Sequence, residues 1–168
     1  MLIKEKTGNL QSFNAANCTI DKLMIEWFEA NKRIMHKVTQ LGKQVTMKFM
    51  QQNPDLKQDD ILFADESYII AVEIKPCQAI VIQPTTILEA ASTCYEIGNK
   101  HLPLFYEGDE LLIPYEAPLY RLLQASGYVI KLEERKLNNP IKTSVSPHAH
   151  SGGSTSLFSK ILQLTSPS

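Results

Sequence analysis

The sequence predicts an α+β protein in which a small all-β N-terminal domain is followed by a ferredoxin-like βαββαβ domain and a flexible C-terminal tail. Between residues 23 and 72, short apolar or alternating runs are separated by turn residues, which is typical of strands. Residues 77–142 instead mix strand-like runs with two amphipathic helical segments, and residues 143–168 are rich in Ser, Thr, Pro and Gly. We therefore expect domains at 1–76 and 77–142, and a tail at 143–168.

The N-terminal domain is expected to consist of antiparallel strands. Residues 23–50 contain two or three strand-like runs, of which Val45 to Phe49 alternates apolar and polar side chains most clearly. The polar stretch 51–60 contains Pro54 and is expected to be a loop. Residues 61–63 and 68–72 flank a turn at residues 65–67 and predict a second hairpin.

The second domain is expected to begin with a buried strand at residues 79–82 and a helix that ends near Ile97. Thr85 or Thr86 can cap the start of this helix, and Gly98-Asn99 tolerates the left-handed conformation that ends one. The apolar positions of the helix recur at three- and four-residue spacing and predict its buried face. These positions are Ile87, Ala90, Ala91, Cys94 and Tyr95.

The rest of the second domain is expected to follow the order strand, strand, helix, strand. Residues 104–107 and 110–113 flank Gly108-Asp109, which favours a tight hairpin turn. Pro118 suits the first turn of a second helix, which ends at Gly127. Residues 128–132 then predict the last strand.

Charge and motifs exclude several classes of function. The 17 basic and 18 acidic side chains nearly balance, so no global charge favours nucleic acid as a partner. No apolar run approaches the roughly 20 residues of a membrane span, and we expect no membrane partner. The three cysteines are widely spaced and the N-terminus lacks a signal peptide, which indicates a cytoplasmic protein. Hydrolase, phosphate-loop and paired-cysteine motifs are absent, so we do not expect an enzyme.

Histidines are the candidate metal ligands. His101 follows the first predicted helix at a defined turn, because Gly98 and Asn99 end the helix and Pro103 prevents its continuation. Nickel prefers four to six N or O ligands, so one histidine per chain requires a second chain, and a two-fold homodimer supplies it. His148 and His150 stand two apart in the tail and can reach one ion together. Imidazole does not by itself select nickel, so zinc or copper could substitute.

Each of these assignments has a simpler alternative. A histidine after a helix is more often a surface or capping residue, and tail histidines are often solvated. His36 lies in a strand-like run and is expected to be structural or exposed, and Cys94 is expected to be a small buried side chain. The whole chain could also be a metal-independent adaptor that binds an extended peptide along a strand edge. RNA binding ranks last, because Phe105 and Tyr106 are the only candidate stacking residues and the acidic Glu107 and Asp109 follow them.

Two segments resemble the UreE family of urease accessory proteins. They are residues 96–103, which contain Gly98-Asn99-Lys100-His101, and residues 107–114. The resemblance extends over about residues 20–142. It implies a peptide-binding first domain and a second domain that dimerises and binds nickel through His101. It also implies delivery of nickel to the urease apoprotein, together with an accessory GTPase complex, during assembly of the urease active site.

Overall fold

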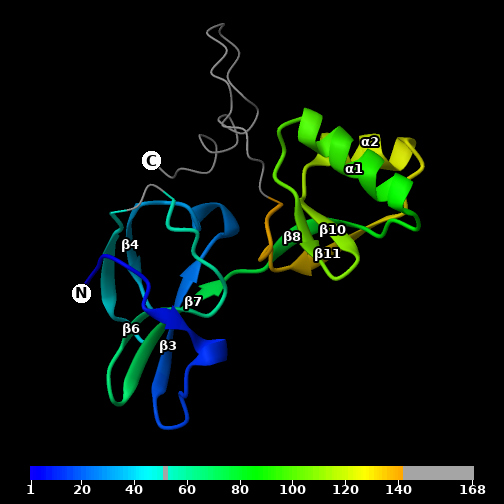
Figure 1. Ribbon diagram of the computed structural model, residues 1–168. Coiled ribbons are helices and arrows are strands. Elements are labelled where there is room, and N and C mark those ends of the chain that lie inside the picture. The colour runs from blue at the N-terminus through cyan, green and yellow to red at the C-terminus, as the bar shows by residue number, and fades with distance from the viewer. Residues whose placement is uncertain (51–52, 142–168) are drawn as a thin grey trace, which may run out of the picture.

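Three β-sheets and two α-helices make up residues 1–50 and 53–141, which the computed structural model describes (Figure 1). Two of the sheets belong to the N-terminal part, residues 1–76. The third sheet and both helices belong to the C-terminal part, residues 77–141. The predicted α+β class, with a β-rich unit first, is confirmed. The predicted tail, residues 143–168, lies outside the described residues.

The N-terminal part contains a three-stranded sheet of order β1-β5-β4 and a four-stranded sheet of order β2-β6-β7-β3. The strands are β1 (Leu2–Ile3), β2 (Gly8–Asn9), β3 (Thr19–Ile25), β4 (Ile34–Val38), β5 (Gln44–Lys48), β6 (Asp60–Ala64) and β7 (Tyr68–Ile74). Two 3-10 helices, η1 (Leu10–Ser12) and η2 (Trp27–Glu29), follow β2 and β3. The predicted hairpin of β6 and β7 is confirmed, and β4 pairs with β5 in antiparallel fashion as expected.

The expected pairing of β3 is wrong. This strand does not join β4 and β5 but runs parallel to β7, with Leu23 opposite Val72. Parallel partners are far apart along the chain, so no local turn signal identifies them. The run around Trp27 forms η2 instead of strand, because Glu26 and Glu29 close a capping box around it.

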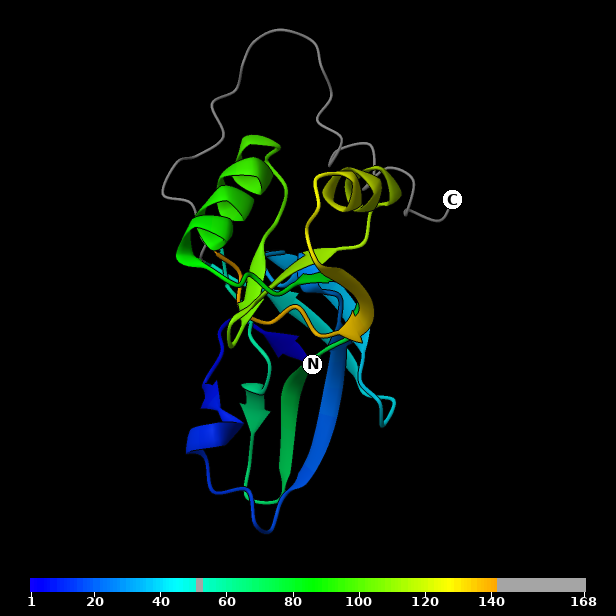
Figure 2. The ribbon, with the colours of Figure 1, turned by 90° about the vertical axis from the view of Figure 1, so that its right-hand side faces the viewer.

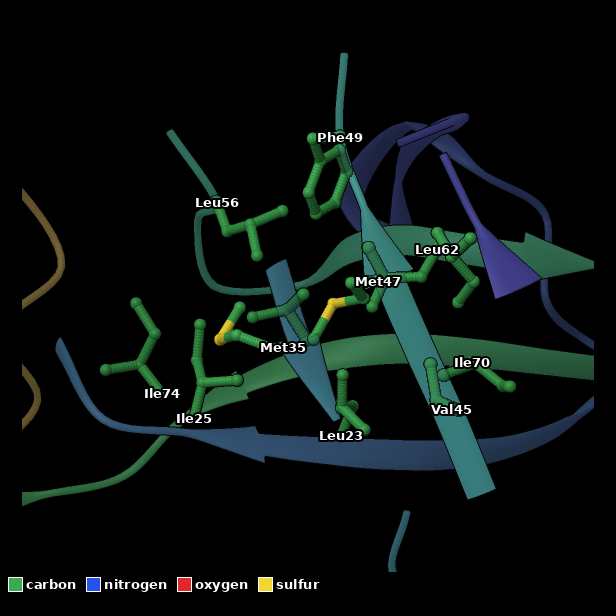
Figure 3. Close-up of a cluster of buried hydrophobic side chains, with 12 residues drawn as sticks. Leu23, Ile25, Met35, Val45, Met47, Phe49, Leu56, Leu62, Ile70 and Ile74 are labelled. Carbon is green, nitrogen blue, oxygen red and sulfur yellow. The ribbon is translucent and has the colours of Figure 1, made fainter. Parts of the chain in front are cut away.

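The core of the N-terminal part lies between the two sheets. Strand residues alternate between the two faces of a sheet, so every second side chain of β4 and β5 points inward. Figure 3 shows Met35, Val45 and Met47 entering the cluster that β3 and β7 complete with Leu23 and Ile70. The outward-facing residues of β4 and β5 are left to solvent.

Buried Asp21 ties the turn between β4 and β5 to the second sheet. Its carboxylate accepts hydrogen bonds from the backbone N–H of Leu41, at 3.0 Å, and from the Tyr68 hydroxyl. The bond to Asp21 raises the pKa of Tyr68 to about 12. Lys43 lies over the Tyr68 ring, 4.4 Å from its centroid. The three-stranded sheet is thus anchored by polar contacts as well as by the core.

The C-terminal part has the predicted βαββαβ order. Its elements are β8 (Cys77–Ile82), α1 (Ile87–Asn99), β9 (Phe105–Glu107), β10 (Glu110–Pro114), α2 (Ala117–Ala125) and β11 (Ile130–Arg135). The strand order β11-β8-β10-β9, with all neighbours antiparallel, is that of a ferredoxin-like sheet. Both helices cover one face of it (Figure 2). Their Ile97, Leu119 and Leu123 pack against β8 and β10 in one cluster.

The other face of this sheet meets the N-terminal part. Trp27 packs against a cluster that includes Val81 and Phe105, and the Trp27 and Phe105 rings meet edge to face with centroids 5.5 Å apart. An ion pair between Lys136 and Glu73 lies across the same contact. Strand β8 is therefore buried on both faces, which explains its unbroken apolar run.

Candidate metal centre

Helix α1 positions the candidate ligand His101 at its C-terminal end. Thr86 caps the start of the helix and accepts a hydrogen bond from the backbone N–H of Glu89 at 3.1 Å, as the sequence predicted for Thr85 or Thr86. The helix continues to Asn99, two residues beyond the expected end near Ile97. His101 follows directly after the C-cap, Lys100.

The turn after α1 is a Schellman motif with a histidine in its left-handed position. The N–H of His101 donates to Gly98 O at 2.9 Å, and the N–H of Leu102 donates to Ile97 O at 3.3 Å. These are the two bonds of that motif, and Leu102 packs on the helix-side core as the motif requires. His101 has φ of +54° at the position that usually holds glycine.

The left-handed backbone makes His101 an expensive residue at this position. A side chain with a Cβ costs roughly 1–2 kcal/mol in this conformation relative to glycine. The His101 side chain is exposed and belongs to none of the core clusters of the described residues, so burial does not offset this cost. The left-handed backbone and the exposed, chemically versatile side chain make His101 the candidate ligand to be tested.

One described chain does not complete a metal site around His101. No group of three His, Cys, Asp or Glu side chains gathers to hold an ion within residues 1–50 and 53–141. The other two candidate ligands, His148 and His150, lie outside the described residues. Any multidentate site at His101 needs ligands from the tail or from another chain.

An exposed apolar stripe runs along α1 toward His101. Leu88 is 76% exposed and Tyr95 is 69% exposed, with Ala91 exposed between them. The predicted buried face of α1 is therefore wrong for Ile87, Ala91 and Tyr95. The helix instead buries Thr93 and Ile97. Ile97 packs against residues of β8 and β10, in the same cluster as Leu102.

The last described residues, 139–141, lie beside the segment that follows His101. The N–H of Ile141 donates to Leu104 O at 2.7 Å, and the N–H of Tyr106 donates to Asn139 O at 3.0 Å. Residues 139–141 therefore run antiparallel to the stretch that follows His101. His148 follows Ile141 by seven positions, a distance along the chain of at most about 25 Å when extended.

The remaining histidine and two of the cysteines have structural surroundings. His36 lies on β4, exposed, with Nδ1 3.1 Å from Thr46 Oγ1. Cys94 packs partly buried beside the helix-side core, as expected, and burial raises the pKa of its thiol. Burial likewise raises the pKa of Cys77 to about 11. Since the thiolate is the form that binds metal, neither thiol is prepared as a ligand.

Comparison with known proteins places both parts of the chain in one family. The model of the UreE urease accessory protein N-terminal domain matches residues 3–75, and that of the C-terminal domain matches residues 77–156. The chain is 45% identical over 164 residues to a urease accessory protein UreE of Flavobacterium johnsoniae, covering 98% of this chain and 99% of the relative. A UreE of Helicobacter pylori is 36% identical, with 95% and 96% covered.

These matches show that the chain is an accessory protein and not an enzyme, as expected. It belongs to the UreE family of urease accessory proteins. Its role lies in urease assembly, which confirms the resemblance drawn from residues 96–103 and 107–114. No helix of the described residues is long and apolar enough to cross a membrane.

Proposed function

We propose that this chain is a nickel metallochaperone that binds Ni²⁺ between two copies and delivers it during assembly of the urease active site. The observation that carries the proposal is His101, an exposed imidazole held in a left-handed turn where glycine would be more stable. The domain division at residues 76 and 142, and a cytoplasmic location, belong to the same proposal.

The apolar stripe of α1 supports a homodimer. Leu88, Ala91 and Tyr95 form an exposed face that ends about one turn before Asn99, the last residue of α1. In a two-fold contact, the same surface of each copy meets its twin. If two copies join along this stripe about a two-fold axis roughly parallel to α1, the two His101 side chains come to the same end of the interface and share an ion.

The exit of the chain at Ile141 supports the tail histidines as further ligands. The last described residues pair with the stretch next to His101, so the tail starts within reach of the proposed site. His148 and His150 can then complete the coordination and dissociate again as the ion is passed on. A site closed by a tail releases its ion more readily than a rigid cage.

Transfer of the ion then needs only ligand exchange. The acceptors in the proposal are the urease apoprotein and its accessory GTPase complex, whose ligands replace the tail histidines. Zinc and copper are expected to bind in place of nickel, because imidazole sites follow the general affinity series. Affinity should fall as the pH drops, since only neutral imidazole binds metal.

Nickel titration by calorimetry tests the proposal on the full chain, with molar mass from light scattering. His101→Asn is the sharpest variant, because asparagine tolerates the left-handed turn but has no imidazole. His36→Asn is the matched control for the loss of an exposed histidine. We expect micromolar or tighter binding near one ion per two chains, lost in His101→Asn and unchanged in His36→Asn.

Equal nickel binding by the wild type and His101→Asn would overturn the site. A chain lacking residues 143–168 measures the contribution of the tail and should bind more weakly. Delivery is tested by urease activation from apoprotein, accessory proteins and the nickel-loaded chain. Activation that does not depend on His101 would favour the metal-independent adaptor instead.

A further inference from the structure

We propose that the outer face of the three-stranded sheet, formed by β4, β5 and β1, docks an acidic, apolar segment of a protein partner. This face lies on the opposite side of the sheet from the cluster in Figure 3. It belongs to the N-terminal part, and nothing in the proposed nickel site uses it. The proposal therefore stands independently of metal binding.

The face presents an aliphatic stripe. Ile34 is 52% exposed and Val38 is 58% exposed, both on β4. Exposed His36 lies between them, opposite Thr46 of β5, and Leu2 of β1 lies on the far side of Thr46. Aliphatic side chains in register along a strand are spaced to receive every second residue of an extended segment.

The charge around the stripe is of one sign. Residues 30–50 contain five basic residues and no Asp or Glu: Lys32, Arg33, Lys37, Lys43 and Lys48. Lys32 and Lys37 pair with Glu29, and Lys43 lies over the Tyr68 ring. Arg33 and Lys48 are exposed and have no ion-pair partner among the described residues. They are the cations left for an external carboxylate.

Their placement brings charge and apolar surface together. Lys48 lies directly opposite Ile34 in the β4–β5 ladder, and Arg33 precedes Ile34 in the chain. The carbonyl of Arg33 accepts a hydrogen bond from Phe49 N–H at 2.9 Å, so the backbone is ordered up to this end of the hairpin. An occupant that matches this face has carboxylates at one end and aliphatic residues beyond them.

Other occupants fit less well. A second copy meeting this face would offer Arg33 and Lys48 no carboxylate, because residues 30–50 contain no Asp or Glu. Single-stranded nucleic acid stacks its bases on aromatic side chains, and β1, β4 and β5 contain no Phe, Tyr or Trp. An acidic protein segment satisfies both the cations and the aliphatic stripe.

Selection from a phage-displayed library of random dodecapeptides, panned on the full chain without added metal, tests the proposal. We expect enriched peptides to combine Asp or Glu with aliphatic residues. A synthetic copy of the most enriched peptide is then measured by fluorescence anisotropy. Arg33→Glu with Lys48→Glu should weaken binding about tenfold, and added salt should weaken it as well.

Two further variants separate charge from apolar contact. Lys57→Glu with Lys131→Glu makes the same change in net charge at exposed positions elsewhere and should leave binding unchanged. Ile34→Thr with Val38→Thr keeps β-propensity but removes aliphatic surface, and should weaken binding at high salt too. All variants are checked for unchanged thermal unfolding.

The proposal is overturned if the enriched peptides lack acidic residues, or if no peptide is enriched. It also fails if the Arg33 and Lys48 variant binds like the Lys57 and Lys131 control. Binding of the chain to phosphatidylserine vesicles is measured in parallel. Vesicle binding that depends on Arg33 and Lys48, without any acidic peptide enriched, would assign the face to a lipid surface instead.

Discussion

The chain exposes apolar side chains on both of its parts, but in different electrostatic surroundings. On α1, the stripe of Leu88, Ala91 and Tyr95 leads toward the last turn of the helix, which Lys100 and His101 follow. On the outer face of β4, Ile34 and Val38 lie beside Arg33 and Lys48, which have no ion-pair partner among the described residues. The first surface can meet a copy of itself, whereas the second offers a copy of itself no carboxylate from residues 30–50.

This difference suggests a division of roles within one accessory protein. A self-complementary surface beside a single histidine completes a site by adding an identical chain. A surface with charge of one sign is suited to a partner of the opposite charge. The two surfaces then need not compete, and each can be disabled separately.

The largest expected effect is the loss of self-association when charges are placed on the α1 surface. Leu88→Glu with Tyr95→Glu should weaken self-association by about 3 kcal/mol, roughly a hundredfold in the dissociation constant, because the charges would be buried in the contact. Ile34→Glu with Val38→Glu is the matched control and should leave the molar mass unchanged. Sedimentation or light scattering over a range of concentrations measures both. Reversed results would exchange the roles of the two surfaces.

An intermediate effect is expected on the free energy of unfolding, from the Lys136–Glu73 ion pair between the N-terminal and C-terminal parts. Burial favours the neutral form of Glu73, but hydrogen bonds from Lys136, Lys22 and Gln58 outweigh this and lower its pKa to about 2. A lowered folded-state pKa contributes stability above pH of about 4.5, which is lost as the pH falls toward 2. Glu73→Gln should cost on the order of 2 kcal/mol of unfolding free energy at neutral pH.

Urea unfolding at neutral and acidic pH measures this effect, and Trp27 fluorescence reports on the same contact. Trp27 is the only tryptophan, and it packs across this contact. Glu134→Gln, at an exposed position of β11, is the control. If Glu73→Gln retained the full loss of stability between pH 7 and pH 3, the ion pair with Lys136 would not be its source.

The smallest expected effect tests whether His101 is kept for function. His101→Gly should raise the free energy of unfolding by about 1 kcal/mol, because glycine adopts the left-handed conformation without strain. His101→Ala keeps the strain and should leave stability near that of the wild type. Chemical denaturation compares the three chains. A destabilised His101→Gly chain would mean that the imidazole supports the fold. His101 would then be no evidence that the α1 surface adjoins a metal site.

Local signals predicted the elements of the C-terminal part well. The cap at Thr86, the turn at Gly108 and the helix end near Gly98 were all readable, because capping and left-handed turns restrict residue type. In the N-terminal part, the parallel pairing of β3 with β7 had no such signal. The two-residue strand β1 was also too short to show a period.

For the candidate site, residue identity was predictable but surroundings were not. A turn at His101 was predictable from Gly98, Asn99 and Pro103, but the left-handed position expected at Gly98-Asn99 was wrong, because both residues lie in α1 and His101 itself is left-handed. Which side of α1 is buried did not follow, because Ile87 and Tyr95 are as apolar as Cys94. Only the docking of α1 on β8 and β10 decided that the stripe faces outward.

The sequence by itself determined the element order, the fold class, the family resemblance and the histidine at the turn, since each depends on residues close together in the chain. The tertiary structure decided the contact of Trp27 with Phe105 and the exit of the chain at Ile141. It also decided which apolar residues remain exposed. These properties depend on segments far apart in the chain, and no local pattern encodes them.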